Sequence, residues 1–121
     1  MKAVICGANG AMGKLIDGIL GDAVVGRVSI DGENGVPKTF GELGNVGADM
    51  VIDFSHHTAV ADVLQYAKDT GCAAVIGTTG HTAEEKELIY TAAKEIPVFY
   101  SGNMSLGIAV LYNEMRKLGA L

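Results

Sequence analysis

Short, mostly apolar runs alternate with segments of helical periodicity along this chain. Apolar runs of this length, without the three- to four-residue spacing of a helix, are typical of strands buried on both faces. Strands joined by helices predict an α/β fold with a doubly wound, mainly parallel sheet that carries helices on both faces. The predicted strands are Ala3 to Cys6, Val24 to Ile30, Met50 to Phe54, Ala73 to Ile76 and Pro97 to Tyr100.

The first helix is predicted directly after the first strand. Its apolar positions recur every three or four residues, and Gly21 follows them as a helix-ending glycine would. The predicted buried face consists of Met12, Leu15, Ile16, Ile19 and Leu20.

Three more helices are expected. The second covers residues 57–68, the third begins at a capping box formed by Thr82 and Glu85, and the last runs from Ser105. The segment 36–40 contains Pro37 and is expected to be a short edge strand or a loop. The second helix is expected to bury Val60, Leu64 and Ala67, and the third Leu88, Ile89, Ala92 and Ala93.

Composition narrows the class of protein. The 121 residues are 49% hydrophobic and 19% charged, which suits one globular domain. Fourteen acidic and nine basic residues give a net charge of -5, which repels phosphate polymers and excludes a nucleic-acid partner. No apolar stretch reaches about 18 residues and no signal peptide pattern is present, so we expect a cytoplasmic protein without a membrane partner. Cys6 and Cys72 lie in apolar runs and are expected to be buried thiols.

A glycine-rich loop is the strongest chemical signal. Gly7, Gly10 and Gly13 lie between the first predicted strand and the first predicted helix. Such a loop turns tightly and brings main-chain amides and the positive end of a helix to a diphosphate, as in Rossmann-type folds. Asp31, 21 residues after Gly10, is placed to accept hydrogen bonds from the adenosine ribose. The alternative is a glycine turn with an unrelated surface aspartate.

The cofactor's phosphate state follows from the residue after Asp31. This residue is Gly32 and not an arginine that could pair with a 2′-phosphate, which favours NAD over NADP. A role for Lys38 or Arg27 at the 2′ position would reverse this inference.

Four short motifs follow one another along the chain. They are Gly7-Ala-Asn-Gly-Ala-Met-Gly13, Val51-Ile-Asp-Phe-Ser55, Val75-Ile-Gly-Thr-Thr-Gly80 and Asn103-Met-Ser-Leu-Gly107. In these motifs and in their order, the chain resembles the N-terminal, nucleotide-binding half of the 4-hydroxy-tetrahydrodipicolinate reductase (dihydrodipicolinate reductase) family of bacterial lysine and diaminopimelate biosynthesis, over nearly its whole length.

The resemblance implies an oxidoreductase that uses NADH, or NADPH, to reduce a cyclic dicarboxylate, and a homotetrameric assembly. It assigns the diphosphate to Gly7, Ala8, Asn9, Gly10, Ala11 and Met12, and the adenosine ribose to Asp31. It assigns the nicotinamide end to Gly77, Thr78, Thr79, Ser101, Gly102, Asn103 and Met104.

The family's substrate domain, with its histidine pair, lysine and dicarboxylate-binding loop, has no counterpart in this sequence. We therefore expect residues 1–121 to form the dinucleotide-binding domain alone, with no catalytic residue and no metal site, to bind NADH weakly and to be inactive. An apolar surface around Leu111, Met115 and Leu118 predicts self-association. The three histidines, His56, His57 and His81, are expected to be solvated residues near helix starts.

Two other functions stay open. A stand-alone nucleotide-sensing module would need the same glycine loop and no catalytic base. A short-chain or epimerase-type dehydrogenase would use a Tyr-x-x-x-Lys pair, which Tyr90 and Lys94 match. This pair falls outside the predicted buried face of its helix, so chance helical spacing is the better explanation.

Overall fold

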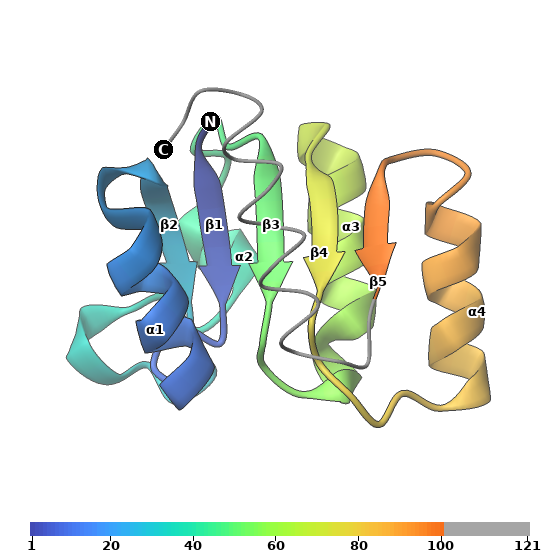
Figure 1. Ribbon diagram of the computed structural model, residues 1–121, viewed down its shortest axis with the longest axis horizontal. Coiled ribbons are helices and arrows are strands. Elements are labelled where there is room, and N and C mark those ends of the chain that lie inside the picture. The colour runs from blue at the N-terminus through green and yellow to red at the C-terminus, as the bar shows by residue number, and fades with distance from the viewer. Residues whose placement is uncertain (101–121) are drawn as a thin grey trace.

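Five parallel strands, in the order β2-β1-β3-β4-β5, form one sheet among residues 1–100 (Figure 1). The computed structural model describes residues 1–100; the predicted helix from Ser105 and the apolar residues at 111, 115 and 118 lie outside this range. The Rossmann-type α/β fold predicted from the sequence is confirmed. The strands are β1 (Ala3–Cys6), β2 (Val24–Val28), β3 (Met50–Asp53), β4 (Ala73–Ile76) and β5 (Val98–Tyr100).

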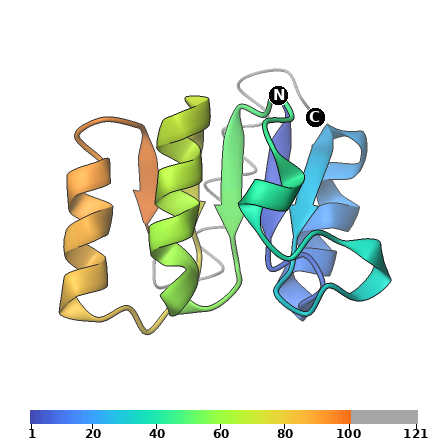
Figure 2. The same cartoon turned by 180° about the vertical axis from the view of Figure 1, so that it is seen from behind.

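Helices cover both faces of the sheet. Helix α1 lies on one face, while α3 lies on the other with α2 beside it, and α4 packs against α3 and β5 (Figures 1 and 2). The helices are α1 (Ala11–Leu20), α2 (Phe40–Leu43), α3 (Val60–Thr70) and α4 (Ala83–Ala92). Short 3-10 turns cover Gly21–Ala23, Glu33–Gly35 and His57–Ala59.

Local signals explain where the helices begin and end. Gly21 follows α1 with a positive φ of 55°, which a glycine adopts without strain. Thr82 and Glu85 form the predicted capping box of α4. The segment 36–40 is a loop up to Thr39, whose hydroxyl caps α2. The sequence did not predict α2 because four residues are too few to show helical periodicity.

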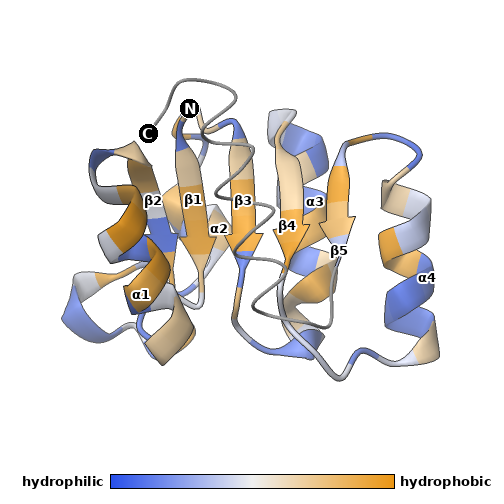
Figure 3. Cartoon of the chain, viewed as in Figure 1, coloured by the Kyte–Doolittle hydropathy of each residue, from blue (hydrophilic) through white to orange (hydrophobic). Residues whose placement is uncertain are grey.

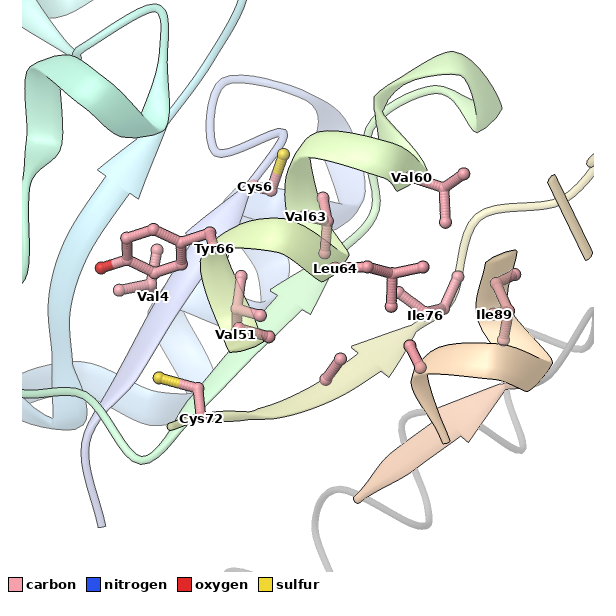
Figure 4. Close-up of a cluster of buried hydrophobic side chains, with 13 residues drawn as sticks. Val4, Cys6, Val51, Val60, Val63, Leu64, Tyr66, Cys72, Ile76 and Ile89 are labelled. Carbon is pink, nitrogen blue, oxygen red and sulfur yellow. The ribbon is translucent and has the colours of Figure 1, made fainter. Parts of the chain in front are cut away.

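Alternate residues of the strands pack on opposite faces, which gives two hydrophobic clusters. In β1, Val4 and Cys6 pack toward α3 and Ile5 packs toward α1. Figure 4 shows the cluster under α3, in which Val63 and Leu64 lie against the sheet. The strands are apolar along most of their length, as the hydropathy colouring in Figure 3 shows. This two-sided burial is why the strand positions could be predicted from short apolar runs.

The buried faces of two helices are narrower than predicted. In α1, Leu15 and Ile19 are 50% and 42% exposed, and only Gly13, Ile16 and Leu20 are buried. In α4, Leu88 is 46% exposed and Ala93 is exposed. Among residues 1–100, α4 lies at the edge of the sheet and packs mainly on α3 and β5, so a narrow stripe around Ile89 is enough to cover this contact.

The second strand ends earlier than predicted, at Val28 and not at Ile30. Strand β2 stops at Val28 because the Ser29 amide donates to the Pro37 carbonyl, at 2.9 Å, and not to the neighbouring strand. Ile30 is therefore outside the sheet and 90% exposed. The thiols of Cys6 and Cys72 are free and buried, as predicted. None of the helices among residues 1–100 is long and apolar enough to cross a membrane.

Candidate functional site

The carboxyl ends of the strands meet at one edge of the sheet. In register, Val28 of β2 lies beside Cys6 of β1, Cys6 beside Asp53 of β3, and Asp53 beside Ile76 of β4. Ligands of doubly wound folds bind at this edge. The loops that follow these strands therefore form the candidate site.

Gly7 and Gly13 are required by the packing of the chain itself. Gly7 has a φ of +86°, and a Cβ there would lie 2.8 Å from the carbonyl oxygen of Phe54. A Cβ on Gly13 would lie only 2.0 Å from the carbonyl oxygen of Gly7. These two glycines let the first turn of α1 and the β3–α3 loop close on the end of β1.

Gly10 differs from its two neighbours. It has a φ of -77° and a ψ of 168°, a conformation open to any residue, and a Cβ there would meet only the Gly7 oxygen at 3.4 Å. Packing within the described chain therefore does not require a glycine at this position. A residue without a side chain at the start of α1 instead allows an external group to approach the main chain.

The start of α1 offers unpaired hydrogen-bond donors. The Lys14 amide is the first to bond back, to the Gly10 carbonyl at 2.9 Å. No described residue accepts a hydrogen bond from the amides of Ala11, Met12 and Gly13, the first turn carries no acidic residue, and Gly10 supplies no side-chain cap. These amides and the helix dipole suit an anion, so the residues present fit a diphosphate.

A cleft of about 1110 Å³ runs from this loop across the end of β2 to α2 and α3. It brings together three predicted site residues, Gly7, Gly10 and Asp31. The lining also includes Lys38, which the sequence raised as a candidate for the 2′ position. Further lining residues were not assigned to the site from the sequence, because they come from separate elements: Phe40, Ser55, His56 and Tyr66. Ala8, by contrast, is buried beneath the loop.

Asp31 is exposed, and neighbouring side and main chains fix its position. Its Oδ1 accepts from Asn9 Nδ2 at 2.7 Å and from the Glu33 amide at 3.0 Å. These two donors, the Asn9 amide foremost, hold the pKa of the Asp31 carboxyl below its ordinary value. Asp31 therefore carries a negative charge at the edge of the cleft.

The two basic residues considered for a 2′-phosphate lie in different places. Arg27 is bound to Asp17 of α1 through both its Nε and its Nη2, the latter at 2.9 Å from Oδ1. Lys38 lines the cleft and lies over Gly32, where a Cβ would come 2.6 Å from the lysine Cε. Of these two residues, only Lys38 therefore lines the cleft, next to the residue that follows Asp31, whereas the charge that acts on the Asp31 carboxyl is that of Lys14.

The structure describes only some of the residues that were expected at the nicotinamide end. Gly77, Thr78 and Thr79 follow β4 but do not line the cleft. Thr78 is buried, and its hydroxyl donates to the Asp53 carbonyl at 3.2 Å. Their contact with a ligand stays a prediction. The other residues expected there, Ser101, Gly102, Asn103 and Met104, lie outside the described range.

His81 is buried and not solvated, which corrects the prediction. It is 7% exposed, its Nδ1 lies 3.3 Å from the Tyr100 hydroxyl, and its Nε2 has no partner among the described residues. Burial lowers the pKa of His81. His57 is half-buried and bonds through Nδ1 to Glu85 Oε1 at 2.7 Å, whereas His56 is exposed as expected. Sequence reasoning missed these contacts because one joins the loop after β3 to α4 and the other joins the loop after β4 to β5.

Asp53 is a fully buried carboxyl at the centre of the strand ends. Its Oδ1 accepts from the Ser55 amide at 3.0 Å and from the Ser55 hydroxyl, while Oδ2 has no partner within residues 1–100. Burial is the main cause that raises the pKa of Asp53.

This carboxyl predicts a pH dependence of stability. Because its pKa is raised in the folded state, the folded chain retains a proton that the unfolded chain releases, so this contribution to stability is lost as pH rises through the folded pKa. We expect Asp53→Asn to gain stability relative to wild type between about pH 4 and about pH 7, measured by urea unfolding at both values. The exposed Asp22→Asn is the control. A variant-to-wild-type difference that does not change with pH would contradict this assignment.

The Tyr-x-x-x-Lys pair takes no part in the cleft. Tyr90 is 58% exposed on α4, and neither it nor Lys94 lines the cleft at the glycine loop. This placement agrees with chance helical spacing and gives no support to a short-chain dehydrogenase.

Comparisons with known proteins agree with the motifs. A family model described as "Dihydrodipicolinate reductase, N-terminus" matches residues 1–104. A 4-hydroxy-tetrahydrodipicolinate reductase of Campylobacter jejuni is 39% identical over 113 residues, which cover 92% of this chain and 45% of that protein. The protein of the same name from Alkaliphilus oremlandii is 37% identical over 123 aligned residues, covering 100% of this chain and 49% of that protein. The chain thus spans about half the length of the curated relatives it matches.

Proposed function

This chain belongs to the dihydrodipicolinate reductase family, and on that premise we propose that its glycine loop and Asp31 bind a nicotinamide dinucleotide. The observation that carries the proposal is the contrast among the three glycines. A side chain at Gly7 or Gly13 would clash with main-chain atoms of the chain itself. A side chain at Gly10 would not, although Gly10 lies at the start of α1 and lines the cleft. An anion that binds close to the main chain at Gly10 explains why this position has no side chain.

Each part of the site has a separate task in this proposal. The amides of residues 11–13 donate to the diphosphate, and Asp31 accepts from the hydroxyls of the adenosine ribose. The dinucleotide, when bound, supplies a hydride. The chain contributes orientation, which is worth about 7 to 11 kcal/mol when both reactants are held.

The reaction of the whole protein is proposed from its relatives. Those relatives are named 4-hydroxy-tetrahydrodipicolinate reductase, so we propose reduction of a cyclic dicarboxylate as the reaction that this dinucleotide site serves. A homo-oligomeric assembly and a cytoplasmic location belong to the same proposal.

We propose that NADH is the preferred dinucleotide. The charge of Asp31 opposes a 2′-phosphate and favours a free 2′-hydroxyl. Lys38 supplies one positive charge on the same side of the cleft, so NADPH binding would depend on this residue.

The substitution Asp31→Ala should change the affinities for NADH and NADPH by different amounts. We expect the dissociation constant of NADH to rise about tenfold, because a charged acceptor for the ribose hydroxyls is lost. NADPH should lose less affinity, since the variant also removes a repulsion. The measurement is titration of wild type and variant with each dinucleotide by calorimetry, with Asp22→Asn as the control.

Two results would oppose the proposal. Equal losses for NADH and NADPH would remove Asp31 from the ribose site. A wild-type chain that binds neither dinucleotide at about 1 mM would contradict dinucleotide binding as a whole.

A further inference from the structure

Asn9 connects the glycine loop to the loop after β2. Its Nδ2 donates to Asp31 Oδ1 at 2.7 Å and to the Glu33 carbonyl at 3.0 Å, across 22 and 24 positions of the sequence. We infer that Asn9 is a positioning residue that orients the Asp31 carboxylate for the ribose hydroxyls, and not a side-chain contact of the diphosphate. The inference rests on the proposed dinucleotide site and extends it.

The hydrogen bonds that Asp31 accepts go to one of its two carboxylate oxygens. Oδ1 accepts from Asn9 and from the Glu33 amide, at 2.7 and 3.0 Å, and no described residue donates a hydrogen bond to Oδ2. An exposed aspartate without such partners rotates freely between its side-chain conformers. Fixing Oδ1 leaves Oδ2 as the oxygen that accepts from a ribose hydroxyl, and the ordering of the side chain is completed before the ligand arrives.

A carboxamide suits this position better than any similar side chain. Both protons of Nδ2 are used, one on a carboxylate and one on a carbonyl. An aspartate at position 9 would place a second negative charge against Asp31. An alanine there would remove the largest of the interactions that lower the pKa of Asp31 and leave the Glu33 amide with the smaller influence of Ser29. Asn9 is also the first cause of the lowered pKa of Asp31, so it stabilises the charged form that the ribose needs.

The bridge also ties two parts of the site to each other. Asn9 lies between Gly7 and Gly10, in the loop assigned to the diphosphate, and Asp31 lies in the loop assigned to the ribose. A change at Asn9 should therefore act on the ribose through Asp31. This dependence distinguishes a positioning residue from a direct contact.

The test is a double-mutant cycle of Asn9→Ala and Asp31→Ala, with NADH affinity as one measurement. We expect Asn9→Ala to weaken NADH binding about fivefold in the wild-type background and to have little effect when Asp31 is already alanine. Asp22→Asn is the control, since Asp22 is exposed, does not line the cleft and takes no part in the hydrogen bonds at Asp31.

A second measurement does not depend on any ligand. The Asp31 carboxyl carbon, followed by NMR in the free chain, should titrate with a pKa closer to the ordinary value in Asn9→Ala. An unchanged titration, or an equal loss of NADH affinity with and without Asp31, would overturn the positioning role. Failure of wild type to bind NADH would overturn the proposed function instead, and the NMR titration would still decide whether Asn9 holds Asp31.

Discussion

Gly13→Ala is expected to destabilise this fold by about 3 kcal/mol or more, at the upper end of the range for overpacking a well-filled site. The added Cβ would lie 2.0 Å from the carbonyl oxygen of Gly7 and 2.8 Å from the Cα of Ala8. Both obstacles are main-chain atoms, so no side-chain rotation relieves the clash. The first turn of α1 would have to move away from the end of β1.

Gly18→Ala is the matched control on the same helix. A Cβ at Gly18 meets no described atom within 4 Å, and alanine is favoured over glycine inside a helix by about 0.5 to 1 kcal/mol. Urea unfolding should therefore show opposite signs for the two substitutions. Equal small effects would mean that the glycine loop does not pack on α1 as described.

Gly10→Ala, unlike Gly13→Ala, is expected to weaken dinucleotide binding while the fold is retained. Its φ of -77° accepts an alanine, and the nearest atom to the new Cβ is 3.4 Å away. Alanine at an N-cap costs roughly 1 kcal/mol of stability or less compared with glycine. A methyl group at the main chain's closest approach to a diphosphate should raise the NADH dissociation constant at least about tenfold, or ~1.4 kcal/mol.

The measurement pairs calorimetric titration with urea unfolding of the same samples. Gly18→Ala again serves as the control, because it lies on α1 and outside the cleft. Unchanged NADH affinity in Gly10→Ala would remove the diphosphate from this loop, even if the chain binds the dinucleotide elsewhere.

The pattern of apolar residues predicted the sheet well and the helix faces less well. Strands buried on both faces must be apolar at nearly every position, so a run such as Ala3 to Cys6 is hard to misplace. A helix face depends on how much of the fold lies beside it. Leu15, Ile19 and Leu88 have helical spacing, yet they are exposed because α1 and α4 each pack along a narrow stripe.

The site was predicted in part. Gly7, Gly10 and Asp31 could be assigned because a glycine loop between a strand and a helix and an acid after the next strand form a local pattern. The hydrogen bond from Asn9 to Asp31 and the burial of His81 could not, because each depends on loops that follow different strands.

The sequence by itself determined the Rossmann-type fold, the family and the position of the glycine loop. All three depend on short segments, in which the periodicity of apolar residues and the turn residues fix the local structure. Only the tertiary structure decided which glycine is left open and which of the two candidate cations, Arg27 and Lys38, lines the cleft. Parallel strands bring their carboxyl ends together from distant parts of the chain, so packing between the loops there sets the space at Gly10. The packing of α1 beside β2 holds Arg27 on Asp17, which leaves Lys38 as the one of the two that lines the cleft.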